Sequence, residues 1–114
     1  MSMFWLTAIV RPFKLSDVYE RLLTVGVGGM TVTEVKGFGN QKADTEIYRG
    51  NAYTSRFVPK VKIELAVCEK DLERVVESIV ESSQTGSPGD GKIFVYKLEQ
   101  ALRIRTGEVD LEAI

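Results

Sequence analysis

Four segments of the chain carry the apolar pattern of β-strands. Residues 4–10 are nearly all apolar, and residues 92–98 form a second apolar run that is rich in β-formers. Residues 30–36 combine threonine and valine, although their alternation breaks at Glu34-Val35. Residues 60–67 alternate cleanly between apolar and charged side chains. We therefore predict four strands, with the first buried on both faces.

Two segments between these strands have apolar residues at helical spacing. The first follows Ser16 or Asp17 as a candidate N-cap, ends at Gly26, and has an apolar face of Val18, Leu22 and Val25. The second matches the i, i+3, i+4, i+7, i+8 spacing of an amphipathic helix through Leu72, Val75, Val76, Ile79 and Val80.

The resulting order, βαββαβ, predicts an α+β ferredoxin-like sandwich in one domain over residues 1–114, with a four-stranded antiparallel sheet and two helices on one face. Two helices cover one face of such a sheet, and the first and last strands lack the polar alternation of a wet second face. We therefore expect a homo-oligomer, in which another copy covers that face. The alternative is that the C-terminal segment folds over the sheet.

The stretch from Gly37 to Pro59 is far longer than a strand connection needs, and shows neither helical nor alternating periodicity. Loops of this length are usually functional. It carries Tyr48 and Tyr53 among charged residues, which suggests an arm used for contact.

Composition narrows the function classes. The net charge of −1 gives no general attraction to nucleic acid, and no apolar run approaches the length of a membrane span. The single cysteine, Cys68, cannot form an internal disulfide, so a cytoplasmic protein is expected. The absence of histidine argues against zinc chemistry and histidine-assisted nucleophiles.

Two segments of the last third suit an anion. Residues 86–92 match the letters GxxxxGK of a phosphate-binding loop, but Ile93 replaces the magnesium-binding hydroxyl and the loop runs from helix to strand, which excludes a P-loop nucleotidase. The glycines and Lys92 still suit an anion, although a structural turn is the plainer interpretation. If extended, Arg103-Ile-Arg105 projects two guanidiniums to one face, where an anion relieves their repulsion.

Several motifs together resemble the PII nitrogen-regulatory signalling proteins. They are Arg11-Pro-Phe-Lys14, Gly29 to Gly39, Thr45 to Gly50, Pro59 to Glu64, Thr85-Gly86, Gly89 to Val95 and Arg103 to Glu108. The resemblance runs from end to end. It implies a homotrimer that binds ATP or ADP in clefts between subunits, binds 2-oxoglutarate together with Mg²⁺ and ATP, and regulates targets through a long T-loop. The resemblance places this T-loop at about 38–58, a glycine-rich B-loop at about 84–91 and a C-terminal segment at about 99–114.

The resemblance also implies site residues. Nucleotide contacts are expected from Thr31, Gly37, Phe38, Gly39, Asn40, Gln41, Gly89, Asp90, Gly91 and Lys92, with Arg103 and Arg105 from the adjacent subunit. Gln41 is expected to help hold Mg²⁺, and 2-oxoglutarate to contact Gln41, Gly39 and Lys60. Tyr53 falls at the position that is uridylylated, or in some relatives adenylylated.

The chain departs from the family pattern at three places: Asn40 replaces a frequent arginine, Asn51 replaces a serine that is phosphorylated in some photosynthetic relatives, and Ser87-Pro88 replaces the more usual pair. The loss of the arginine could weaken ATP binding. The implied function is that of a sensor of nitrogen, carbon and energy status. Its targets include an ammonium transporter, N-acetylglutamate kinase or nitrogen-regulatory enzymes, and the sequence does not choose among them. The alternatives are a PII-like trimer that responds to another small ligand, and a small nucleotide hydrolase. The lack of histidine and of a carboxylate or hydroxyl pair beside the glycine loop speaks against the hydrolase.

Overall fold

The computed structural model describes residues 1–38, 45–48, 51–54 and 57–114, with the two short ranges described by their backbone. The strands are β1 Met3–Val10, β2 Thr31–Gly37, β3 Thr45–Tyr48, β4 Asn51–Thr54, β5 Val58–Cys68 and β6 Gly91–Leu98. The α-helices are α1 Leu15–Thr24 and α2 Leu72–Ser83, and the short 3-10 turns are η1 Pro12–Lys14, η3 Glu69–Asp71 and η4 Asp110–Glu112.

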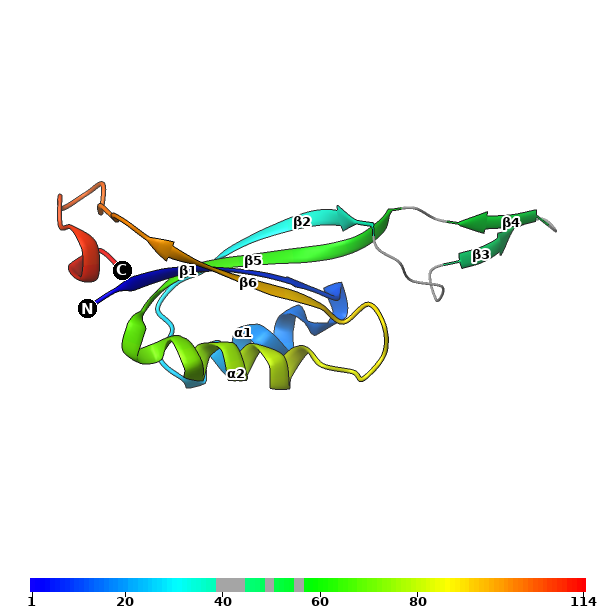
Figure 1. Cartoon of the computed structure of the whole chain (residues 1–114), viewed down its shortest axis with the longest axis horizontal. Coiled ribbons are helices and arrows are strands. Elements are labelled where there is room, and N and C mark those ends of the chain that lie inside the picture. The colour runs from blue at the N-terminus through cyan, green and yellow to red at the C-terminus, as the bar shows by residue number, and fades with distance from the viewer. Residues whose placement is uncertain (39–44, 49–50, 55–56) are drawn as a thin grey trace.

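The main sheet has the order β2-β5-β1-β6, and all of its neighbouring strands are antiparallel. Figure 1 shows both helices on one side of this sheet. The predicted ferredoxin-like sandwich, with two helices on one face of four antiparallel strands, is therefore confirmed.

The core lies between the helices and the sheet because every second residue of the central strands faces α1 and α2. On β1 these residues are Leu6, Ala8 and Val10, each at most 1% exposed. Their partners are Val61, Ile63, Leu65 and Val67 of β5 with Val18, Leu22, Val75 and Ile79 of the helices. The predicted helical faces are the ones that pack in this core, except that Val80 is 43% exposed.

The expected N-cap of the first helix is wrong. The capping position is Lys14, because η1 leads directly into α1 and neither Ser16 nor Asp17 precedes the first turn. The other end is as predicted: Gly26 has a φ of 91°, and Val27 N donates to Leu22 O at 3.0 Å. A positive φ is unfavourable for residues that have a Cβ, so glycine is the usual residue at a helix end of this kind.

The long connection has structure of its own, which the absence of periodicity did not indicate. β3 and β4 pair as a separate two-stranded sheet that extends away from the body of the molecule (Figure 1). β5 also begins at Val58, two residues before the predicted start at Lys60.

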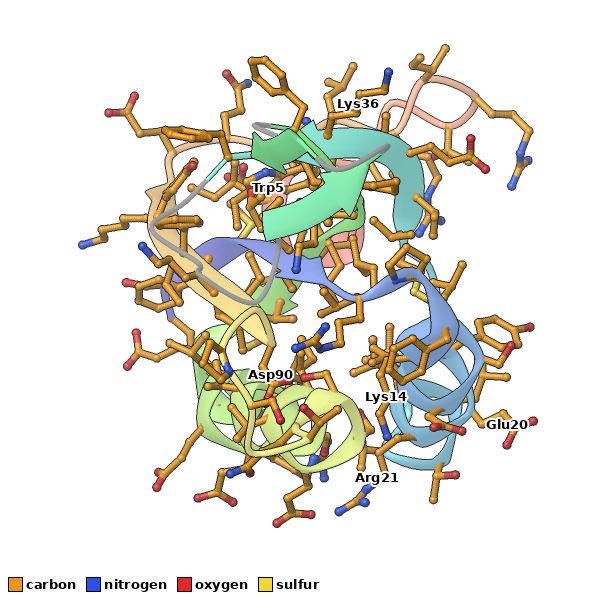
Figure 2. The ribbon with its side chains drawn as sticks, turned by 90° about the vertical axis from the view of Figure 1, so that its right-hand side faces the viewer. Trp5, Lys14, Glu20, Arg21, Lys36 and Asp90 are labelled. Atoms are coloured by element: carbon orange, nitrogen blue, oxygen red, sulfur yellow. The ribbon has the colours of Figure 1, made fainter. Side chains whose placement is uncertain are left out.

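The helix-free face of the sheet carries a polar cluster with aromatic neighbours. Glu64 Oε2 accepts hydrogen bonds from Trp5 Nε1 at 3.1 Å and Thr7 Oγ1 at 3.2 Å, and Lys62 Nζ lies 3.6 Å from Glu64 Oε1. The indole N–H of Trp5 is the main reason that the pKa of Glu64 is lowered. In the end-on view of Figure 2, Trp5 lies on the side of the sheet away from the helices.

Nearby on β6, Phe94 and Tyr96 are 45% and 53% exposed. The C-terminal residues gather at the end of the sheet beside the N-terminus, beyond the end of β6 (Figure 1). The aromatic residues of this face therefore stay accessible in the single chain. No helix in the described ranges is long and apolar enough to cross a membrane.

Candidate ligand site

The glycine-rich loop between α2 and β6 is built on left-handed backbone. Gly86, Gly89 and Gly91 have φ values of 86°, 101° and 109°. At Gly91 a Cβ would lie 1.7 Å from Ile9 O, so the loop enters β6 at a point where only glycine fits. These positions explain the spacing of glycines that resembles a phosphate-binding loop.

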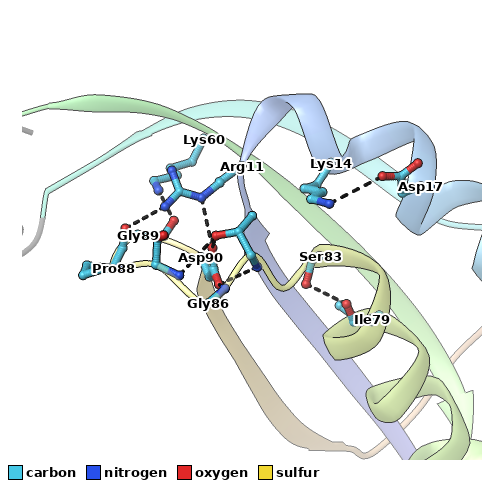
Figure 3. Close-up of polar contacts among 12 residues, drawn as sticks. Arg11, Lys14, Asp17, Lys60, Ile79, Ser83, Gly86, Pro88, Gly89 and Asp90 are labelled. Atoms are coloured by element: carbon cyan, nitrogen blue, oxygen red, sulfur yellow. Dashed lines mark hydrogen bonds and ion pairs between the residues drawn. The ribbon is translucent and has the colours of Figure 1, made fainter. Parts of the chain in front are cut away.

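The Asp90 side chain points into this loop (Figure 3). Its Oδ2 accepts from Thr85 N at 2.8 Å and from Gly86 N at 2.9 Å. Its Oδ1 accepts from Thr85 Oγ1 and from Arg11 Nε, the latter at 3.0 Å. These contacts, with the Thr85 hydroxyl first among them, hold the pKa of Asp90 well below its usual range.

Two cations join the loop to the sheet. Arg11 follows β1, and its Nη2 donates to Pro88 O at 2.6 Å. Lys60 of β5 is 8% exposed, and its Nζ donates to Gly89 O. The residue expected to hold 2-oxoglutarate is thus bonded to the backbone of the loop expected to hold the nucleotide (Figure 3).

Most of the other described site residues lie on the helix-free face. Thr31 pairs with Glu64, which alternates with the core residues Ile63 and Leu65 of β5. Lys92 pairs with Ile9, which lies between the core residues Ala8 and Val10 of β1. Gly37, at the end of β2, pairs with Val58, and the next residue, Phe38, is 68% exposed. Gly37 and Lys60 are close, because a Cβ on Gly37 would lie 3.4 Å from Lys60 Cγ.

Arg103 and Arg105 lie elsewhere, and their segment is not extended. Arg105 is in a turn, with Gly107 at a φ of 75°, and Arg103 Nη1 donates to Glu108 Oε1 at 2.8 Å. The sequence argument that places both guanidiniums on one face of an extended segment is therefore wrong for this chain. Both residues follow the end of β6 opposite to the glycine loop, about 26 Å away along eight strand residues.

A cavity of about 810 Å³ lies at this opposite end. Gly28, Gly29, Ala66, Arg74 and Arg103 are among its lining residues. It contains Arg103 but none of the loop residues 84–92. One chain therefore brings together Gly37, Lys60 and Gly89 to Lys92, and separates them from the two arginines.

The side chains of four predicted site residues are not among those that the structure describes. Gly39, Asn40 and Gln41 lie outside the described residues altogether. Tyr53 belongs to β4, of which only the backbone is described, and it pairs with Glu46 of β3. Their expected roles stay predictions.

Sequence reasoning missed Arg11 and Thr85, which hold the glycine loop. Both fall within the motifs that carry the family resemblance, but neither was given a role. An isolated cation directly after a buried strand, and a threonine five residues before Asp90, are the sequence signals that could have indicated them.

The family model for the nitrogen regulatory protein P-II matches residues 3–108. The chain belongs to the P-II family. Among curated P-II relatives, the Rhizobium etli protein is 57% identical over 107 residues, which are 94% of this chain and 96% of that protein. P-II 1 of Escherichia coli K12 is 56% identical over 107 residues, again 94% of this chain and 96% of that protein.

A solved structure of this P-II family, the Arabidopsis thaliana PII protein bound to citrate, is similar throughout. Its TM-score is 0.81 at 38% identity, with 99% of this chain and 92% of that chain covered. The relatives are named as regulatory proteins and not as enzymes, in agreement with the prediction that this chain is not an enzyme.

Proposed function

We propose that this P-II chain acts as a homotrimeric sensor of nitrogen, carbon and energy status. It binds ATP or ADP, with Mg²⁺ and 2-oxoglutarate as further effectors, and regulates target proteins in the cytoplasm through the T-loop at about 38–58. Candidate targets are an ammonium transporter, N-acetylglutamate kinase and nitrogen-regulatory enzymes.

The observation that carries the proposal is the separation of the two cationic halves of the site. Lys92 and the glycine loop stand at one end of β6, and Arg103 and Arg105 follow its other end, about 26 Å away. A triphosphate that contacts both halves needs the arginines of a second chain. The exposed aromatic side chains of the helix-free face supply a surface for that second copy.

The donor set suits the proposed effectors. Lys60 and Lys92 are cations on the same face of the sheet, and Gly37 leaves room beside Lys60. The Arabidopsis relative is described as bound to citrate, a ligand with carboxylates, and we propose that Lys60 likewise holds a carboxylate of 2-oxoglutarate. When bound, Mg²⁺ would neutralise phosphate charge, with Gln41 supplying an amide oxygen.

The contact between Lys60 and Gly89 O suggests how the two effectors communicate. A carboxylate at Lys60 and a phosphate at the glycine loop act on residues that are already in contact. Mg²⁺, ATP and 2-oxoglutarate together hold the base of the T-loop at Gln41 and Lys60, whereas ADP alone leaves it free to extend. Targets then meet two different surfaces.

Calorimetry tests the proposal. 2-Oxoglutarate should bind at least about tenfold more tightly in the presence of Mg²⁺ and ATP than in their absence. Lys92→Ala should weaken ATP binding, and Lys97→Ala on the same strand is the matched control. Lys60→Met should abolish the response to 2-oxoglutarate. If 2-oxoglutarate binds with the same affinity with and without Mg²⁺ and ATP, the proposal is contradicted. That result would favour a trimer that responds to another small ligand.

A further inference from the structure

We propose that Asp90 is a positioning residue: together with Thr85 and Arg11 it fixes the shape of loop 84–91 before a ligand arrives, and its carboxylate does not contact the nucleotide. This inference rests on the proposed function for the identity of the ligand. The brace itself, defined as the contacts of Asp90, Thr85 and Arg11, is present in the ligand-free chain (Figure 3).

The first argument is the accepting capacity of a carboxylate. Two oxygens offer about four acceptor positions, and all four are used by Thr85 N, Thr85 Oγ1, Gly86 N and Arg11 Nε. A carboxylate turned toward a phosphate would also repel it. Directed into the loop, the Asp90 charge is instead matched by Arg11 at 3.0 Å.

The second argument is the route of the contacts through the loop. The Thr85 hydroxyl donates to Asp90 and accepts from Ser87 N at 3.2 Å, so one side chain links both ends of the turn. Arg11 spans two further points, Asp90 through Nε and Pro88 O through Nη2. A lysine has a single nitrogen at its tip and lacks the planar fork that makes both contacts.

The consequence concerns the binding of an anion by backbone groups. A glycine-rich loop has many conformations, and ordering them at the moment of binding lowers affinity. Because the brace orders the loop when the chain folds, this cost does not fall on ligand binding. Removing it should therefore reduce ATP affinity while leaving the sheet and helices as they are.

Thr85 offers a matched pair of variants. Thr85→Val has nearly the same shape without the hydroxyl, and Thr85→Ser keeps the hydroxyl. In calorimetry of the full-length protein, we expect Thr85→Val to raise the Kd for ATP at least about tenfold and Thr85→Ser to stay within about threefold of wild type. Asp90→Asn should behave like Thr85→Val. Ser87→Ala is the control, since Ser87 takes part in the turn through its backbone N–H.

A second measurement separates positioning from direct contact and from general stability. In the ligand-free protein, hydrogen exchange at the Thr85 and Gly86 amides should speed up in Thr85→Val and Asp90→Asn but not in Thr85→Ser, with an unchanged unfolding temperature. Wild-type ATP affinity in both Thr85→Val and Asp90→Asn overturns the inference, as does unchanged exchange in the ligand-free protein. A drop in unfolding temperature with unaltered ATP affinity also overturns it. If wild-type protein fails to bind ATP, the proposed function falls, and the exchange measurement still decides whether the brace exists.

Discussion

Gly91 is the residue whose replacement the structure most strongly forbids. Its φ of 109° is unfavourable for any L-residue, and a Cβ would lie 1.7 Å from Ile9 O and 2.8 Å from Ile9 C, both backbone atoms of β1. Gly91→Ala should therefore lower the free energy of unfolding by more than about 3 kcal/mol. Gly107→Ala is the control, because its φ is 75° but nothing lies within 4 Å, and it should cost about 1 kcal/mol. Urea denaturation measures both, and equal losses would contradict this account.

Glu64 should contribute to the pH dependence of stability. Its pKa is lowered in the folded chain, first by the Trp5 indole N–H, so its contribution is present above the ordinary pKa of 4.5 and is lost as the pH falls through the lower folded value. Thermal unfolding of Glu64→Gln should therefore depend less steeply on pH below 4.5 than unfolding of wild type. Glu99→Gln, at an exposed position after β6, is the control. If the unfolding temperatures of wild type and Glu64→Gln fell equally steeply below pH 4.5, the Trp5 and Thr7 contacts would not favour the charged form of Glu64.

At the scale of elements, the β3–β4 hairpin is structurally separate from the main sheet. Its two strands pair with each other and form their own sheet in the described ranges. A two-stranded ribbon adds little independent stability, and loop closure depends weakly on length. Replacing residues 45–54 by four Gly/Ser residues should change the free energy of unfolding by no more than about 1 kcal/mol. A loss of several kcal/mol in chemical denaturation would mean that the hairpin supports the fold.

The elements that the sequence predicts well are those with a strict period. β5 alternates and α2 has a complete amphipathic stripe, since each buries one face in a shared core. The hairpin was missed because four-residue runs are too short to show a period. A two-residue separation that includes Gly50 was its available signal. The prediction that Arg103 and Arg105 project to one face was wrong for another reason. It required an extended segment, whereas the chain turns there and Arg103 pairs with Glu108.

The contacts that complete the candidate site are the least predictable from sequence. Arg11 and Asp90 are 79 positions apart, and they meet because β1 and β6 are neighbours in the sheet. The residue types of the site could be predicted from the family motifs. The direction of the Asp90 side chain could not, because it depends on which groups the fold brings to it.

At the scale of the whole molecule, the helix-free face should be an interface between copies of the chain. Phe94 is 45% exposed on this face, and burying a charge there without a partner is costly. In sedimentation, wild type should have three times the 12.7 kDa mass of one chain at micromolar concentration, and Phe94→Glu should have a lower mass. Phe13→Glu, at a residue 69% exposed beside α1, should leave the mass unchanged. A monomeric wild type would contradict the proposed assembly.

The proposed sharing of the site between chains can be tested by mixing two defective proteins. Lys92→Ala removes one half of the site, and the double change Arg103→Ala with Arg105→Ala removes the other. Each protein alone should bind ATP poorly. After unfolding and refolding together in equal amounts, about a quarter of the clefts should combine an intact loop from one chain with intact arginines from another, and that fraction should regain binding. Sites built within one chain could not recover in this way, because every chain in the mixture carries a defect. The number of ATP molecules bound per chain therefore distinguishes a site shared between chains from a site within one chain. Two wild-type samples refolded together give the reference for complete recovery.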